Sequence, residues 1–177
     1  MRLGIFAAMC TVLAIAVSAC GSKVVIEEGA RYVILSKSGT TCLDVPGGSK
    51  APGTGIVLWM VHSLSNSYPN QNWVFRQAEN SDEYKIVSAH SDLHLDVSGG
   101  SDANGIPIVQ WPDNGPAADN QTWILEKSGE FVKIRSKKSG KYMSTADGSQ
   151  NASIGVVQNE TLPEMADSQL WVLKKIP

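Results

Sequence analysis

Residues 93–123 gather three side chains whose chemistry is complementary. Asp96 supplies a carboxylate, which accepts charge-assisted hydrogen bonds. Trp111 supplies a large flat apolar surface, and the amide of Asn120 both donates and accepts hydrogen bonds. Segments rich in Gly, Asn and Asp separate the three, which is typical of turns. Such a set suits a small ligand that has both an apolar face and polar groups.

The layout around this set occurs three times along the chain. Gln-x-Trp sequences end at Trp73, Trp123 and Trp171, which are 50 and 48 residues apart. A motif at regular spacing indicates a repeat architecture. Residues two apart on a strand share a face, so we expect each Gln to lie on the same side as its Trp and the three indoles to fill a common core. The glutamines beside them are Gln71, Gln121 and Gln169, and each needs a hydrogen-bond partner because an unpaired buried amide costs about 1–3 kcal/mol.

Short β-type runs separated by clusters of turn residues make up the chain from Ala30 onward, which predicts an all-β fold. One weak helical turn is expected over residues 162–167. The twelve expected strands, four in each repeat, are residues 31–36, 41–45, 55–60, 72–75, 84–88, 93–97, 106–111, 122–125, 131–135, 141–145, 154–158 and 170–173.

Three Gln-x-Trp units about 50 residues apart, each preceded by a run like Cys42-Leu43-Asp44-Val45, resemble the ricin B-type lectin family. The resemblance covers residues 30–177. It implies a β-trefoil with twelve strands in three lobes, a six-stranded barrel and a cap of hairpins. It also implies a binding module for glycan or polysaccharide, with no cofactor.

A sugar ring presents an apolar C–H face and a rim of hydroxyl groups, so an aromatic platform, a carboxylate and an amide meet its demands. The resemblance places these groups in two repeats. The implied carbohydrate-binding residues are Asp96, Trp111, Asn120 and Gln121 in the second repeat and Asp44, Trp59, Asn70 and Gln71 in the first. Gln121 is expected to orient Asp96 from behind.

Both sets depart from the family pattern in places. Val109 stands where the family often has a polar residue, and whether Gln110 replaces it is open. Asp113 and Asn114 could also reach the ligand. In the first repeat the loop of residues 62–70 is two residues longer, so it could reshape or cover the site.

The third repeat keeps the core residues Gln169 and Trp171 but lacks the binding set. Ser144, Asn159 and Ser168 stand where a carboxylate, an aromatic residue and an amide are needed. We therefore expect a structural lobe. The loss of these residues from a repeat that keeps its core also indicates that the fold alone does not require the Asp–Trp–Asn sets of the other two repeats.

Simpler interpretations exist for several of these residues. Asp44 and Asp96 precede Gly-rich turns, where aspartate often bonds local backbone. His90, Asp92, His94 and Asp96 alternate as on a metal-binding strand, but a turn at Ser91-Asp92 interrupts them, so we predict no metal site. Cys42, within an apolar run, is expected to be a buried structural thiol.

The N-terminus resembles a bacterial lipoprotein signal. An apolar stretch from Leu3 to Val17 precedes Val17-Ser18-Ala19-Cys20, in which Cys20 would carry the lipid. The expected division is a signal peptide over 1–19, a lipidated tether over 20–29 and the β-trefoil over 30–177. Gly21 is not the aspartate that retains such proteins at an inner membrane, so the outer membrane of a bacterial envelope is favoured.

Composition narrows the function further. A formal net charge of −2 gives no support for nucleic-acid binding. No hydrolase, zinc-protease or phosphate-loop motif is present, and Asp44 and Asp96 belong to different repeats, so we predict a protein that is not an enzyme. The alternative is a protein-interaction or inhibitor β-trefoil, because this fold hosts both kinds of function.

Overall fold

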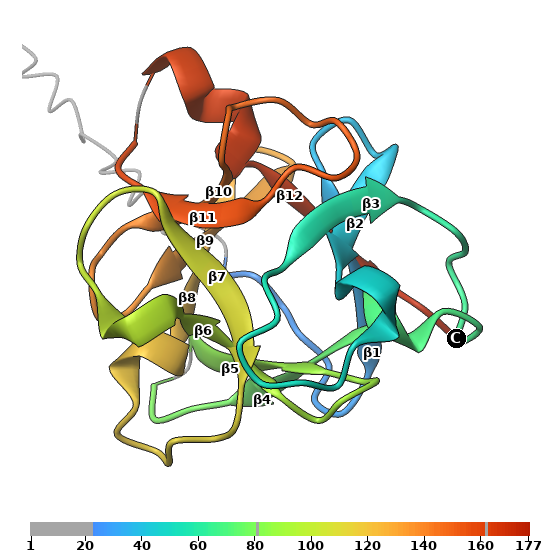
Figure 1. Cartoon of the computed structure of the whole chain (residues 1–177), viewed down its shortest axis with the longest axis horizontal. Coiled ribbons are helices and arrows are strands. Elements are labelled where there is room, and N and C mark those ends of the chain that lie inside the picture. The colour runs from blue at the N-terminus through green and yellow to red at the C-terminus, as the bar shows by residue number, and fades with distance from the viewer. Residues whose placement is uncertain (1–22, 81, 162) are drawn as a thin grey trace, which may run out of the picture.

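The structure is a computed structural model that describes residues 23–80, 82–161 and 163–177. The expected signal peptide and Cys20 lie outside this range. The described residues form twelve strands and five short 3-10 helices (Figure 1). The strands are β1 (Arg31–Ser36), β2 (Thr41–Asp44), β3 (Val57–Met60), β4 (Trp73–Gln77), β5 (Glu83–Ser88), β6 (His94–Val97), β7 (Ile106–Trp111), β8 (Trp123–Ser128), β9 (Phe131–Ser136), β10 (Tyr142–Thr145), β11 (Val156–Asn159) and β12 (Trp171–Lys175). The helices are η1 (Pro46–Gly48), η2 (Pro69–Gln71), η3 (Ser98–Gly100), η4 (Asp119–Gln121) and η5 (Pro163–Gln169).

Six of the strands close into a barrel. β1 pairs with β4 and β12, β5 pairs with β4 and β8, and β9 pairs with β8 and β12. A closed ring leaves no free strand edge for another chain to pair with. The other six strands form the hairpins β2–β3, β6–β7 and β10–β11. Bridges join these hairpins to one another as a cap, which confirms the β-trefoil.

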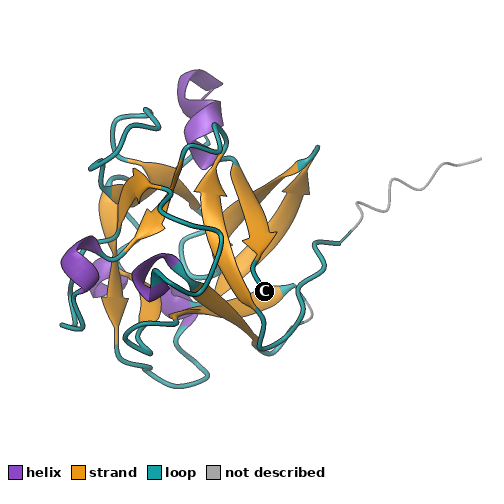
Figure 2. Cartoon of the chain, turned by 90° about the vertical axis from the view of Figure 1, so that its right-hand side faces the viewer, coloured by secondary structure: helices purple, strands orange, loops and turns teal. Residues whose placement is uncertain are grey.

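Each lobe consists of four consecutive strands, and the three lobes surround a common axis (Figure 1). The first lobe is β1–β4, the second β5–β8 and the third β9–β12. All twelve expected strands are present, with ends that differ by a few residues. The weak helical turn expected over 162–167 is the 3-10 helix η5. Figure 2 shows the short helices at the periphery of the strands, where they form turns that line the surface.

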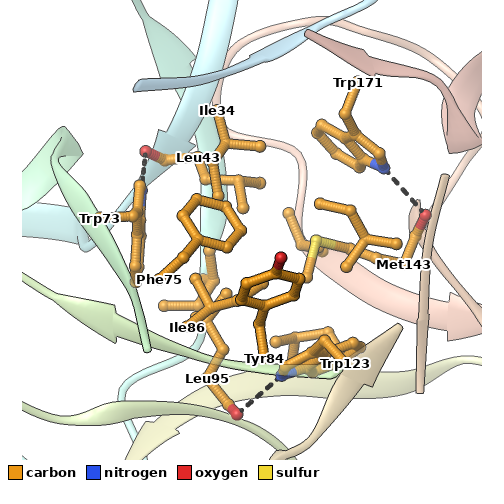
Figure 3. Packing of buried hydrophobic residues seen from close by; sticks show 14 of the residues in the cluster. Ile34, Leu43, Trp73, Phe75, Tyr84, Ile86, Leu95, Trp123, Met143 and Trp171 are labelled. Carbon is orange, nitrogen blue, oxygen red and sulfur yellow. Dashed lines mark hydrogen bonds between the residues drawn. The ribbon is translucent and has the colours of Figure 1, made fainter. Parts of the chain in front are cut away.

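The three motif tryptophans are core residues, as expected. Trp73, Trp123 and Trp171 are at most 1% exposed and belong to one apolar cluster. Figure 3 shows the indoles on three sides of a centre that Phe75 and Tyr84 help to fill.

Each indole also ties the barrel to the hairpin of its own lobe. The Nε1–H donates to a backbone carbonyl on the first hairpin strand, at 3.1–3.3 Å. The acceptors are Leu43 for Trp73, Leu95 for Trp123 and Met143 for Trp171. The polar end of each buried indole is thereby satisfied, and the hairpins are fixed over the barrel.

The motif glutamines do not lie on strands beside the indoles, which corrects the expectation that they share a strand face. Gln71, Gln121 and Gln169 end the 3-10 helices η2, η4 and η5 instead. A helical turn directs the glutamine away from the indole two residues later. All three glutamines are fully buried, and each Nε2 donates hydrogen bonds. The Oε1 atoms of Gln71 and Gln121 also accept a backbone N–H, whereas Gln169 Oε1 has no partner among the described residues.

Part of the tether expected over 20–29 packs on the barrel. Val24 and Ile26 pack against the core cluster, and Lys175 forms an ion pair with Glu27. Alternate apolar side chains therefore extend the packed unit before residue 30. Within residues 23–80, 82–161 and 163–177, no helix has the length and hydrophobicity that crossing a membrane requires.

Candidate functional site

An open hollow of about 520 Å³ lies on the second lobe, and Asp96, Trp111 and Asn120 all line it. These residues come from β6, β7 and η4. Asp96 lies opposite Val109 in the β6–β7 hairpin, and Trp111 is two residues further on, so the carboxylate and the indole share a face. The structure thus brings together the set that the family resemblance implied. We call this the second-lobe hollow.

The Asp96 carboxylate is held by two amides. Gln121 Nε2 and Asn120 Nδ2 donate to the same oxygen, Oδ2, at 2.8 and 2.9 Å. The other oxygen, Oδ1, accepts from none of the described residues. One half of the carboxylate is therefore a fixed anchor, and the other half remains available to a ligand.

Gln121 positions the carboxylate from behind and does not line the hollow. Its Nε2 also donates to the carbonyl of Pro112 at 2.8 Å, and its Oε1 accepts from the Asn114 N–H at 3.0 Å. One buried amide thus fixes both Asp96 and the loop that follows Trp111. The orienting role expected for Gln121 matches this geometry, whereas direct contact with a ligand does not, and the same holds for Gln71.

The first lobe carries a matching hollow of about 480 Å³, lined by Asp44, Trp59 and Asn70. Gln71 and Asn70 donate to Asp44 Oδ2 at 2.9 and 3.0 Å, as in the second lobe. We call this the first-lobe hollow. Its platform is 39% exposed, and Trp111 in the other hollow is 42% exposed, so both indoles are accessible.

The longer loop of the first lobe reshapes its hollow without covering it. His62 forms part of the wall, and Tyr68 stacks on His62 with ring centroids 4.6 Å apart. Tyr68 does not line the hollow. His62 takes the place of Asn114, since each donates its N–H to the motif glutamine of its lobe, so the first-lobe hollow has an imidazole where the second-lobe hollow has an amide.

The third lobe has neither the carboxylate nor the platform, as expected. The hairpin register places Ser144 and Asn159 where the other lobes have aspartate and tryptophan. Asn159 Oδ1 accepts from the Gly105 N–H at 2.9 Å, so it joins the second lobe to the third. Ser144 and Ser168 bond each other at 3.0 Å, and Met165 packs against Gly148 on this lobe.

Burial raises the pKa of both aspartates. Asp44 and Asp96 are each 4% exposed, and loss of hydration disfavours the charged form. The amide hydrogen bonds oppose this shift but do not cancel it. Each carboxylate therefore takes up a proton at a higher pH than an exposed aspartate would.

Gln110 does not act as a substitute for Val109. Val109 lines the second-lobe hollow, whereas Gln110 is buried on the opposite side of β7. Its amide donates to the carbonyls of Ser49 and Ala51 at 3.0 and 2.9 Å. Gln158 repeats this arrangement one lobe later, with the carbonyls of residues 101 and 103. These glutamines join adjacent lobes.

Two lining residues escaped the sequence reasoning because they come from neighbouring lobes. Gly53 of the first lobe lies against the platform, and a Cβ there would be 3.4 Å from Trp111 Cζ3. Lys138 of the third lobe also lines the second-lobe hollow. Comparison within one repeat does not reveal such residues.

Of the remaining sequence candidates, only Asn114 belongs to one of the two hollows. Asn114 lines the second-lobe hollow, but Asp113 lines a separate hollow of about 600 Å³ with Lys85 and His94. Among the described residues, no three His, Cys, Asp or Glu side chains group as metal ligands would. Cys42 is fully buried, and burial raises the pKa of its thiol to about 12, as suits a structural residue.

A family model matches a part of the chain that includes the whole second lobe. The family model described as "Ricin-type beta-trefoil lectin domain-like" matches residues 69–159, just over half of the chain. The chain belongs to this ricin-type β-trefoil lectin family. Membership supports a carbohydrate-binding role in general terms, and the family is generally non-catalytic.

Solved structures agree with the ricin-type fold. The designed threefold-symmetric protein ThreeFoil is 26% identical, with a TM-score of 0.73 over 81% of this chain and 97% of its own. An exo-β-1,3-galactanase from Clostridium thermocellum is 27% identical, with a TM-score of 0.75 over 86% of this chain but 31% of its own. The Macrolepiota procera ricin B-like lectin, solved with lactose, is 18% identical, with a TM-score of 0.67 over 85% and 99%. A search of curated proteins gives no match.

Proposed function

We propose that this chain is a non-catalytic carbohydrate-binding protein that holds a sugar unit in each of the first-lobe and second-lobe hollows. The observation that carries the proposal is that a carboxylate, an indole and an amide converge in an open hollow twice. The third lobe shares the core and has no such set. A fold requirement alone would not produce this difference.

The mechanism of binding follows from the geometry of the second-lobe hollow. The C–H face of a sugar ring packs on the exposed indole of Trp111. Hydroxyl groups donate to Asp96 Oδ1, while Gln121 and Asn120 hold the other oxygen still. The hollow is shallow, so affinity for one sugar is weak, and two hollows on one chain increase the avidity for a polymer.

Binding to immobilised glycans and polysaccharides tests the proposal. The purified protein is expected to bind a subset of them saturably, and the free monosaccharide is expected to compete only at high concentration. Retention by no glycan or polysaccharide of a broad array would contradict the proposal.

Carbohydrate binding is expected to fall on acidification, at a higher pH than an exposed aspartate would give. Burial raises the pKa of Asp96, and only the ionised form makes charge-assisted bonds to hydroxyls. By linkage, binding is complete above the raised pKa and is lost as the pH falls through it. Affinity measured from about pH 7 to about pH 3 checks this, and a midpoint at or below about 3.9, the value of a free aspartate, would contradict it.

We infer that the chain is anchored in a bacterial envelope, in the outer membrane where two membranes exist. The support is the run Val17-Ser18-Ala19-Cys20 after an apolar stretch. In a bacterial host, labelled palmitate is expected to enter the wild-type protein and to be absent from Cys20→Ser. Equal labelling of both proteins would contradict the anchor at Cys20.

Protein interaction is a second candidate that one observation favours. Met60, Leu64 and Tyr68 at the edge of the first lobe are 54%, 43% and 42% exposed, and exposed apolar groups often mark interfaces. Crosslinking would then recover a partner equally well with the wild type and with a variant that lacks Asp44 and Asp96. Recovery that depends on those carboxylates would reject it.

A further inference from the structure

Two adjacent lysines at the end of β9 have different surroundings. Lys137 forms ion pairs with Glu83, Asp119 and Glu79, with Nζ–oxygen distances of 3.1, 3.3 and 3.9 Å. Lys138 forms no ion pair with any carboxylate in the described part of the chain, and its side chain is exposed. Lys137 therefore fixes the turn to the second lobe, while Lys138 keeps an uncompensated positive charge.

This free charge lies at the second-lobe hollow. Lys138 lines the hollow together with Asp96 and Trp111. A Cβ built on Gly100 would lie 3.2 Å from Lys138 Nζ and 3.8 Å from Asn120 Cβ, so the ammonium lies over the η3 turn next to the amide. The hollow thus has a carboxylate and an ammonium at separate places on its wall. Asp96 is anchored by amides and forms no ion pair with Lys138.

The other lobes do not provide a free cation at the matching position. Ser38, His90 and Lys138 each lie two residues after the end of β1, β5 or β9. His90 Nε2 contacts the carbonyl oxygen of Gly48 at 2.6 Å, at the edge of the first-lobe hollow. The Ser38 N–H donates to Gln150 in the third lobe. Of these three turns, only the one after β9, which reaches the second-lobe hollow, presents a charge that no described protein group pairs with.

We propose that the second-lobe hollow selects a sugar unit that carries a carboxylate, such as a uronic acid, and that Lys138 determines this specificity. The proposal rests on the proposed function and adds the substrate class of one hollow. A ligand carboxylate directed at Asp96 would be repelled. With the ring on Trp111 and its hydroxyls at Asp96, a carboxylate directed at Lys138 gains a charge-assisted bond. The first-lobe hollow, without this cation, takes neutral sugars.

A matched pair of ligands and a matched pair of variants test this. The full chain, held in neutral detergent, carries Asp44→Asn so that only the second-lobe hollow reports. Its affinity is measured for polygalacturonate, hyaluronan and alginate, and for the carboxyl-reduced form of each, in which the acid is a neutral alcohol. Lys138→Gln is compared with Lys174→Gln, which removes an equal charge from an exposed residue that lines none of the hollows described above.

The chain with Lys138 is expected to prefer at least one acidic polymer over its reduced form by about three- to tenfold, because a charge-assisted bond at an exposed rim is partly screened. Lys138→Gln should remove the preference, Lys174→Gln should keep it, and added salt should weaken it. Equal loss of both ligand forms in Lys138→Gln, or binding of neutral forms only, would overturn the inference and leave the proposed function standing. No binding of either form by any variant, and none by the chain with Asp44 intact, would overturn both.

Discussion

Replacing Asp44 and Asp96 together with asparagine is expected to abolish carbohydrate binding while the fold persists. Asparagine keeps an oxygen for the amides behind it, such as Gln121. It places an NH2 donor where the free carboxylate oxygen was, so the acceptor for sugar hydroxyls is lost. A hydrogen bond to a charged group contributes about 1.5–3 kcal/mol, so each hollow loses roughly ten- to a hundredfold in affinity.

The single variants divide the effect between the hollows. Asp96→Asn should remove binding of the second-lobe ligand only, and Asp44→Asn that of the first, because the two carboxylates lie in different lobes. Asp102→Asn changes an exposed aspartate that lines neither hollow and is the charge-matched control. The affinities are measured by isothermal titration or biolayer interferometry. Full binding by a folded double variant would show that the carboxylates do not hold the ligand.

The second large effect concerns the two classes of tryptophan. Trp123→Ala removes a fully buried indole and its hydrogen bond to Leu95, so the free energy of unfolding should fall by about 3–5 kcal/mol. That is a large share of the roughly 5–15 kcal/mol by which a domain is stable. Urea denaturation followed by circular dichroism measures the change.

Trp111→Ala is the matched comparison in the same lobe. Its indole is 42% exposed, so the substitution should cost only about 1 kcal/mol of stability but remove the platform of the second-lobe hollow. Trp123→Ala therefore mainly lowers the stability of the fold, and Trp111→Ala mainly lowers the affinity for the ligand. Equal destabilisation by both substitutions would mean that Trp111 is a structural residue.

Much of the fold was predictable because the repeat places the same residues at the same intervals. Trp73, Trp123 and Trp171 each close a lobe, so their spacing indicated the number of lobes and the core. The family resemblance also placed the candidate site correctly on Asp96 and Trp111, and one hairpin register explains why both residues share a face. In both cases the position of a residue within its repeat determines its position within its lobe.

What the sequence did not predict depends on contacts between lobes or on turn geometry. Lys138 and Gly53 reach the second-lobe hollow from the lobes on either side, and no pattern within one repeat signals that approach. Gln110 faces away from the hollow because side chains alternate along β7. Gln121 lies in a 3-10 turn and not on a strand beside Trp123, and this turn was not predicted, although the support that Gln121 gives to Asp96 was.

The indole N–H resonances of the five tryptophans give the most direct test of the central claim. Three of these groups are buried and bonded to Leu43, Leu95 and Met143, and the other two belong to the exposed platforms Trp59 and Trp111. In a nitrogen–proton correlation spectrum, titration with a bound glycan should shift only the two platform resonances, assigned with Trp59→Phe and Trp111→Phe. Saturable binding that leaves both platform resonances unmoved would contradict the account.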